Sequence, residues 1–168
     1  MMKEAVLIFL LHGLLLNLSA QNPEKKPFIY TDSIYEFSIQ FPNEYETRFL
    51  KNSEANQKTL KSSADQDIYL YTETRHNKSF KKNERKHLAS VTLDGFTEVA
   101  HGRILSKEEI TYGNYIGLNT VMELPGKDMI VYHKVLVNKH MQFELVVILN
   151  SKELSKPAQT FLSGLKPE

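Results

Sequence analysis

Four strand-like stretches, separated by short turns between residues 103 and 149, constrain the fold more than any other feature of the chain. The predicted strands span 103–112, 115–124, 129–137 and 140–149. Gly113-Asn114 is a favourable tight turn, and Asn138-Lys139 is interpreted as a second two-residue connection. Strands joined by such short turns run antiparallel, because a parallel pair needs a long crossover. This part of the chain therefore predicts an antiparallel meander.

The first half of the chain predicts further strands. In residues 35–41 the apolar side chains alternate with polar ones, so that Tyr35, Phe37, Ile39 and Phe41 share one face. Pro42 ends this strand because proline has no donor for the ladder. Additional strands are predicted at 47–51, 57–62 and 66–75.

Two helices complete the predicted architecture. Residues 83–102 have apolar positions at helical spacing, with Asn83 as the expected N-cap and Gly102 as the expected left-handed C-cap. Residues 155–166 form a second amphipathic helix, with Pro157 in its first turn. Each apolar stripe must be buried against a sheet. The sequence thus predicts an α+β fold, an antiparallel meander with a mid-chain helix and a C-terminal helix packed on it.

The first twenty residues differ from the rest of the chain. Lys3 is followed by an almost wholly apolar run over 5–16, and small residues stand at Ser19-Ala20. This layout is typical of a cleaved secretory signal peptide over residues 1–20. The alternative is a membrane anchor, but the run is short for a bilayer about 30 Å thick. A lipid anchor would require a cysteine, which the chain lacks.

We interpret residues 21–168 as a single α+β domain, and their composition limits the classes of protein to which the chain can belong. A chain of about 150 residues can bury about 70% of its unfolded surface without a metal or disulfide. The absence of cysteine removes thiolate and disulfide chemistry. A net charge of +1 with 24% charged residues argues against a nucleic-acid binder. We therefore expect a secreted or periplasmic protein with no integral membrane segment after cleavage.

Four stretches of the chain resemble the PsbP-like family of α-β-α sandwich domains. They are the FSIQFP strand, the HLASVTLDGF helix, the YGNYIGLNTVMEL strand with the VYHKVLVNKHMQFELVVIL hairpin, and the terminal FLSGL. Together they cover most of residues 28–166. The resemblance implies an α-β-α sandwich and an accessory or binding role, since such domains usually act through docking. It transfers no functional residue by position.

A basic run over residues 75–87 is the least ordinary surface feature. Its cations are Arg75, Lys78, Lys81, Lys82, Arg85 and Lys86, against one acid, Glu84. The run lies where a strand passes into a helix, so helix N–H groups could add to an anion site. We predict binding of an anionic partner here, an envelope component or an acidic protein face; the alternative is a solvated loop.

No catalytic, cofactor or metal motif is recognisable in the sequence, so we expect no enzyme activity, cofactor or metal. One pair stands out: if Asn138-Lys139 is a two-residue turn, His133 faces Glu144 across the ladder. Such a pair could bind a cation or form an unfamiliar hydrolase site. More often it is a cross-strand contact of about 0.2–1 kcal/mol.

These observations favour an exported, non-enzymatic accessory or binding domain that works through protein or envelope contacts. The alternative is a carrier of a small ligand or lipid, with a pocket of at least about 300 Å³ between sheet and helix.

Overall fold

The computed structural model describes residues 28–151 and 153–165, and the predicted signal peptide lies outside them. The described chain is built from nine strands and two helices. The strands are β1 (Phe28–Asp32), β2 (Phe37–Phe41), β3 (Glu46–Lys51), β4 (Ala55–Ala64), β5 (Asp67–His76), β6 (Arg103–Tyr112), β7 (Tyr115–Leu124), β8 (Met129–Val137) and β9 (Met141–Leu149). The helices are α2 (Lys82–Ala100) and α3 (Lys156–Ser163). All the predicted strands and both predicted helices are confirmed within a few residues.

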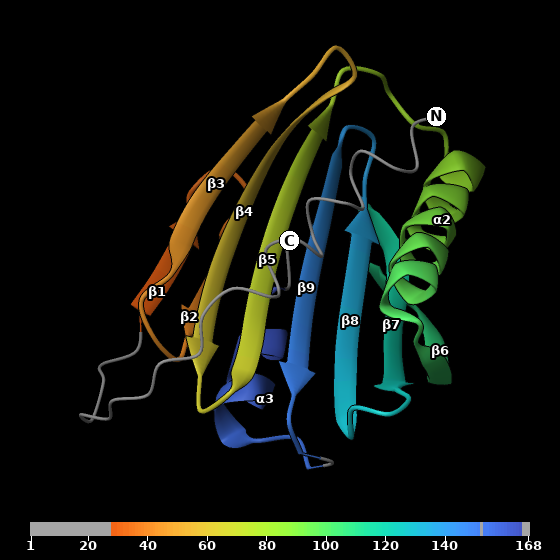
Figure 1. Ribbon diagram of the computed structural model, residues 1–168. Helices are drawn as coiled ribbons and strands as arrows, with labels where there is room; N and C mark the ends of the chain where they lie inside the picture. The colour runs from red at the N-terminus through yellow and green to blue at the C-terminus, as the bar shows by residue number, and fades with distance from the viewer. Residues whose placement is uncertain (1–27, 152, 166–168) are drawn as a thin grey trace.

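Seven strands form one sheet in the order β3-β4-β5-β9-β8-β7-β6, and β1 and β2 form a separate hairpin. Every pairing between neighbouring described strands is antiparallel. The chain makes one meander up to β5, crosses over through α2, and returns through a second meander to place β9 against β5 (Figure 1). The predicted α+β class with an antiparallel meander is confirmed.

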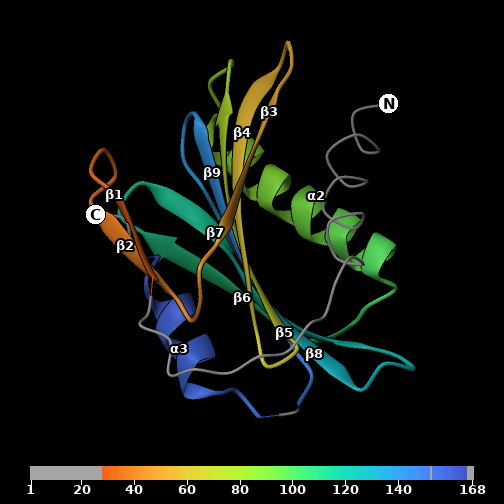
Figure 2. The same ribbon diagram turned by 60° about the vertical axis from the view of Figure 1, so that its left-hand side comes forward.

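The large sheet is covered on both faces. Figure 2 shows α2 on one side of the sheet, with the β1–β2 hairpin and α3 on the other. Beneath α2, a core cluster includes Leu70, Leu93, Phe96, Met122 and Val146. The opposite cluster is larger and more aromatic. Its members include Phe37, Phe41, Tyr71, Phe143 and Phe161.

Strand β9 lies at the centre of this arrangement. All nine of its residues are buried, because it has a neighbouring strand on each side and a core cluster on each face. Its sequence is accordingly a nearly continuous apolar run, broken only by Gln142 and Glu144 on the α2 side. A buried charge needs partners, and the partners of Glu144 are described below.

The ends of α2 differ from the prediction by one or two residues. Its N-cap is Lys81, not Asn83, and Glu84 accepts a hydrogen bond from the Lys81 backbone N–H at 2.6 Å. Glu84 thus stabilises the start of the helix by accepting from the N–H of the N-cap residue itself. At the other end His101, not Gly102, adopts the left-handed conformation, with φ 51°. The Gly102 N–H then bonds back to the Thr97 carbonyl at 2.9 Å and closes the helix.

The short helix α3 follows the predicted pattern. The Ser155 hydroxyl accepts a hydrogen bond from the Ala158 N–H at 3.4 Å, and Pro157 occupies the first turn. Ala158 and Phe161 are fully buried against the sheet. Phe161 meets Phe41 edge-on, with ring centroids 5.0 Å apart, and so links α3 to the β1–β2 hairpin.

Two local predictions about turns are wrong. Strand β2 begins at Phe37, and Tyr35 lies in the turn before it. The β8–β9 connection is longer than two residues, because Val137 pairs with Gln142. The Asn138 side-chain oxygen accepts from the His140 and Met141 N–H groups at 2.9 and 2.7 Å, which stabilises the longer loop.

Gly117 in β7 tests how closely the sheet is packed. A Cβ at this position would lie 1.8 Å from the Val135 carbonyl oxygen in the neighbouring strand. Backbone cannot yield without distorting the ladder, so we expect Gly117→Ala to lower the free energy of unfolding by about 1–3 kcal/mol, measured by urea denaturation. The control Asn119→Ala, on the same strand but exposed, should change it by less than about 0.5 kcal/mol. Equal stability of Gly117→Ala and the parent would contradict this packing.

Candidate functional site

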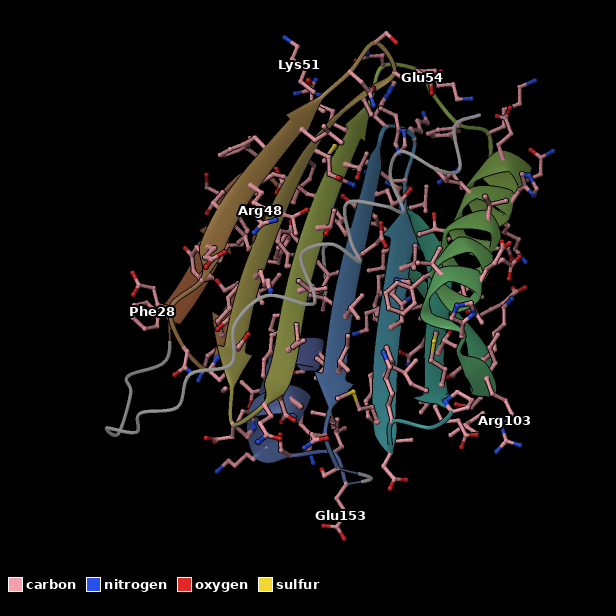
Figure 3. The ribbon with its side chains drawn as sticks, in the orientation of Figure 1. Phe28, Arg48, Lys51, Glu54, Arg103 and Glu153 are labelled. Atoms are coloured by element: carbon pink, nitrogen blue, oxygen red, sulfur yellow. The ribbon has the colours of Figure 1, made fainter. Side chains whose placement is uncertain are left out.

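Three connections lie together at one end of the large sheet. They are the link from β5 into α2, the β6–β7 turn and the β8–β9 loop, all at the upper end in Figure 1. An antiparallel meander places alternate turns at the same end, so this grouping follows from the topology. Figure 3 shows Lys51 and Glu54 at the same end, beside the β3–β4 turn.

Hydrogen bonds fix these connections to one another. The His76 N–H donates to the His140 carbonyl and the Phe80 N–H to the Lys139 carbonyl, each at 2.8 Å. Arg85, in the first turns of α2, donates through Nη1 to the Asn114 carbonyl at 2.7 Å. The loops therefore form a connected rim, not independent flaps.

This rim surrounds a pocket of about 420 Å³. Its lining residues are Tyr35, Arg75, Arg85, Asn114, Asn138, Lys139, His140 and Met141. Two guanidinium groups, one ammonium and one imidazole face this space, and no carboxylate lines it. Four of the lining residues, Arg75, Asn114, Lys139 and His140, are exposed, so the pocket is open to solvent. Its chemistry is that of an anion site. We refer to these eight residues as the basic pocket.

The two arginines are not neutralised by acids in the part of the chain that the structure describes. Among residues 28–151 and 153–165, neither has a carboxylate oxygen within 4.0 Å. Arg85 Nε is buried and has no hydrogen-bond partner in this part of the chain. Glu84, the nearest acid in sequence, accepts from the Lys81 N–H and does not line the pocket. A guanidinium can bind a planar or tetrahedral oxyanion through two parallel hydrogen bonds.

The turn that carries Tyr35 is held by two acids, the buried Asp32 and the half-buried Glu73. Asp32 accepts from the Ile34 and Tyr35 N–H groups at 2.8 and 3.0 Å. Tyr30 links this carboxylate to Glu73, with its hydroxyl 3.2 Å from Asp32 Oδ2 and 3.1 Å from Glu73 Oε2. Burial raises the pKa of Tyr35 above its ordinary value, while the nearby Arg75 opposes the shift. Tyr35 therefore remains a neutral phenol near neutral pH.

The same carboxylates act on the buried tyrosines behind the pocket. Burial, followed by the charge of Glu73, raises the pKa of both Tyr30 and Tyr71 far above the ordinary range. The Tyr71 hydroxyl donates to Glu73 at 3.0 Å, and Lys58 Nζ donates to the Tyr30 oxygen at 2.9 Å. These groups satisfy one another and so form a structural network, which positions the β1–β2 turn.

The six basic residues predicted from the sequence divide into two groups. Arg75 and Arg85 lie together in the basic pocket. The four lysines lie outside its lining. Lys86 pairs with Glu109 at 2.7 Å, and Lys78 Nζ lies 5.1 Å from the centre of the Phe80 ring.

The remaining pair, Lys81 and Lys82, is exposed at the start of α2. Phe80, the apolar residue within the basic run, is buried and meets the His76 ring edge-on at 4.9 Å. It anchors the connection that leads into α2, so its presence has a packing reason.

Sequence reasoning missed half of this pocket. Asn138 and Lys139 were interpreted only as a turn and His140 as the start of the last strand, although strands β5 and β8 both end at the same end of the sheet. The missing information was strand order: Arg75 pairs with Met141 only because β9 is the neighbour of β5. A signal was available in the NKH sequence, which is basic and polar between two apolar strands.

His133 and Glu144 do meet, though not directly across the ladder. In the observed register His133 faces Val146, and Glu144 faces Val135. The predicted register is wrong by two residues, and a slip of two keeps every side chain on its face. The two side chains therefore interact diagonally, with His133 Nε2 3.3 Å from Glu144 Oε2.

This pair is closed between α2 and the sheet. His133 and Glu144 are 1% and 3% exposed, and the imidazole lies 4.8 Å from the Phe96 ring. Gln142 Nε2 donates to Glu144 Oε1 at 2.7 Å and to Thr92 Oγ1 in α2 at 3.2 Å. The arrangement links α2 to the sheet through polar contacts. His133 Nδ1 has no partner in the described chain, but a substrate has no open path to it.

Comparison of the chain with models of protein families, with curated proteins and with solved structures finds no match. The PsbP-like resemblance accordingly stays a prediction. Neither α2 nor α3 is long and apolar enough to span a bilayer.

His76, beside the basic pocket, gives the site a pH dependence. Burial lowers its pKa below the ordinary 6.5, and a hydrogen bond with Gln142 opposes the shift. Below pH 6.5 the His76 side chain binds a proton in the unfolded chain but not in the folded one. The contribution of this group to the free energy of unfolding is therefore fully present above pH 6.5 and is lost as the pH decreases.

We expect the free energy of unfolding to decrease between about pH 7 and 5, and His76→Gln to reduce this slope. The control is His87→Gln, an exposed position on α2, which should keep the parent slope. Identical slopes for all three proteins would refute the assignment.

Proposed function

We propose that the chain is an exported, non-enzymatic binding domain that recognises an anionic partner through the basic pocket and the lysines beside it. The partner is either an anionic component of the cell envelope or a protein with an acidic face. The observation that carries the proposal is the lining of the pocket, where Arg75, Arg85, Lys139 and His140 converge without a carboxylate.

The surroundings of the pocket support this assignment electrostatically. Lys81 and Lys82 are exposed at the start of α2, next to Arg85. A cluster of positive charges attracts an anionic partner from a distance and increases its rate of association. The positive end of the α2 dipole adds to this field.

A binding role, not catalysis, accounts for the buried polar groups. The histidine–carboxylate pair formed by His133 and Glu144 is buried beneath α2. The acidic pair behind the pocket, Asp32 and Glu73, is occupied by Tyr30, Tyr71 and backbone N–H groups. Both networks hold elements in place, which is what a rigid binding surface requires.

The alternative of a lipid carrier expects an apolar pocket between the sheet and α2. There Leu93, Phe96 and Met122 are 0–3% exposed and belong to one packed cluster. The basic pocket is large enough for a small ligand, but its lining is polar and it lies at the end of the sheet. The structure therefore favours a polar anion over a lipid tail as the bound group.

Export is tested by expressing the whole sequence in cells and determining where the product is recovered and at which residue it begins. We expect the protein to be recovered outside the cytoplasm, beginning at Gln21. Mass spectrometry of the intact product measures this directly. Recovery of the uncleaved chain from the cytoplasm would contradict the export part of the proposal and leave the binding part unaffected.

The anionic partner is tested by charge reversal. We expect Lys81→Glu combined with Lys82→Glu to weaken binding to anionic lipid vesicles or to an acidic polymer at low salt by about tenfold or more. The measurement is co-sedimentation with vesicles or retention on the immobilised polymer. The matched control is Lys127→Glu with Lys156→Glu, which makes the same charge change at exposed positions near the opposite end of the sheet. Equal loss in both variants would indicate a general charge effect and refute the site.

A further inference from the structure

We propose that the basic pocket binds a phosphate monoester, a dianionic phosphoryl group attached to a small polar body. This inference rests on the proposed function and deepens it by naming the class of ligand. It is carried by the number of positive charges, the geometry of the two arginines and the polarity of the lining.

The charge of the pocket suits a dianion better than a monoanion. Arg75, Arg85 and Lys139 contribute three formal positive charges, and no lining residue is acidic. A single carboxylate would leave most of this charge uncompensated. A phosphate monoester carries about −1.5 to −2 at neutral pH and offers three acceptor oxygens.

The two guanidinium groups reach the pocket from different elements. Arg75 is near the end of β5 and Arg85 is in the first turns of α2. Arg85 is held by its Nη1 bond to the Asn114 carbonyl, and its buried Nε has no hydrogen-bond partner in the described chain. Two guanidinium groups carried by separate elements in one pocket can bond to different oxygens of a tetrahedral oxyanion.

The loop that supplies Lys139 and His140 is fixed before any ligand arrives. The Asn138 side chain accepts hydrogen bonds from the His140 and Met141 N–H groups. It also forms a hydrogen bond with Tyr115; burial raises the pKa of Tyr115, and this hydrogen bond opposes the shift. The Lys139 carbonyl is fixed by the Phe80 N–H. Binding therefore requires little ordering of the backbone, which favours affinity.

The volume of the basic pocket implies a ligand larger than inorganic phosphate. About 420 Å³ falls within the range of small-molecule sites and exceeds what one phosphoryl group fills. Tyr35 and Met141 provide the apolar surface of the lining, and Asn114 and Asn138 add amide groups. These side chains suit a hydroxylated body, as in glycerol 3-phosphate or a hexose phosphate. The same chemistry is present in the headgroup of phosphatidic acid.

The test uses the protein purified from cells that express the whole sequence. Isothermal titration with inorganic phosphate, glycerol 3-phosphate, succinate and sulfate compares the anions, and co-sedimentation with phosphatidic acid vesicles tests the lipid source. We expect glycerol 3-phosphate to bind at least about tenfold more tightly than succinate or sulfate. ³¹P NMR should show that the second pKa of the bound ester is lower than the free value of about 6, because the cations stabilise the dianion.

Substitutions then locate the site. We expect Arg75→Gln and Arg85→Gln each to weaken binding of the ester by about tenfold or more, as for loss of a charged hydrogen bond. Arg85→Lys keeps the charge and loses the guanidinium fork, so it should fall between the parent and Arg85→Gln. The control is Arg103→Gln, an exposed arginine paired with Glu123 at the edge strand β6, which should bind as the parent does. If a variant unfolds by circular dichroism, the anion series and ³¹P titration of the parent still decide the question.

Each outcome has a defined meaning. Binding of soluble esters with no vesicle association identifies a free metabolite, and vesicle binding that Arg75→Gln abolishes identifies a lipid headgroup; both support the inference. Tighter binding of succinate, or an unchanged second pKa of the ester, overturns the inference while the proposed anion-binding function stands. Failure of every small anion, vesicle and acidic polymer to bind would overturn both.

Discussion

Pairing of β5 with β9 is the interaction on which the rest of the structure depends. It joins two meanders that are separated in the chain by α2 and three strands, and it makes β9 a central strand with all nine residues buried. Both core clusters meet across these strands: Leu70 and Val146 face α2, while Tyr71 and Phe143 face the β1–β2 hairpin. Without this pairing neither cluster would be continuous.

The same pairing builds the basic pocket. Register places Arg75 opposite Met141, so the end of β5 lies against the β8–β9 loop, and the chain leaving β5 enters α2 beside that loop. Backbone hydrogen bonds from His76 and Phe80 to the loop carbonyls then hold these segments together. The cations of the pocket are thus positioned by sheet geometry, and the acidic pair of Asp32 and Glu73 holds the turn that carries Tyr35.

Two networks of polar groups in the interior each link two layers of the fold. Gln142 and Glu144 interrupt an otherwise apolar central strand and connect Thr92 in α2 with His133 in β8. Tyr30, Tyr71 and Glu73 connect the β1–β2 hairpin to the face of the sheet that it covers, which is the face opposite α2. Buried polar groups of this kind are costly unless they are satisfied, so they specify how α2 and the hairpin sit on the sheet. The open, carboxylate-free pocket is the exception, and for that reason it is the surface on which we place function.

The sequence by itself determined the elements and their faces, because alternation with period two and apolar spacing near 3.6 are local properties of each segment. The sequence also contains Arg75 and Arg85 in one basic run. It predicted that His133 and Glu144 lie on one face of the sheet, which is correct although the predicted register was wrong by two residues. Strand order, the left-handed conformation of His101 and the convergence of Lys139 and His140 on the arginines were decided only by the tertiary structure. The physical reason for the strand order and for the convergence of Lys139 and His140 on the arginines is long-range pairing. Which strand lies beside which depends on how the whole set of apolar faces is best buried, and no single segment carries that information.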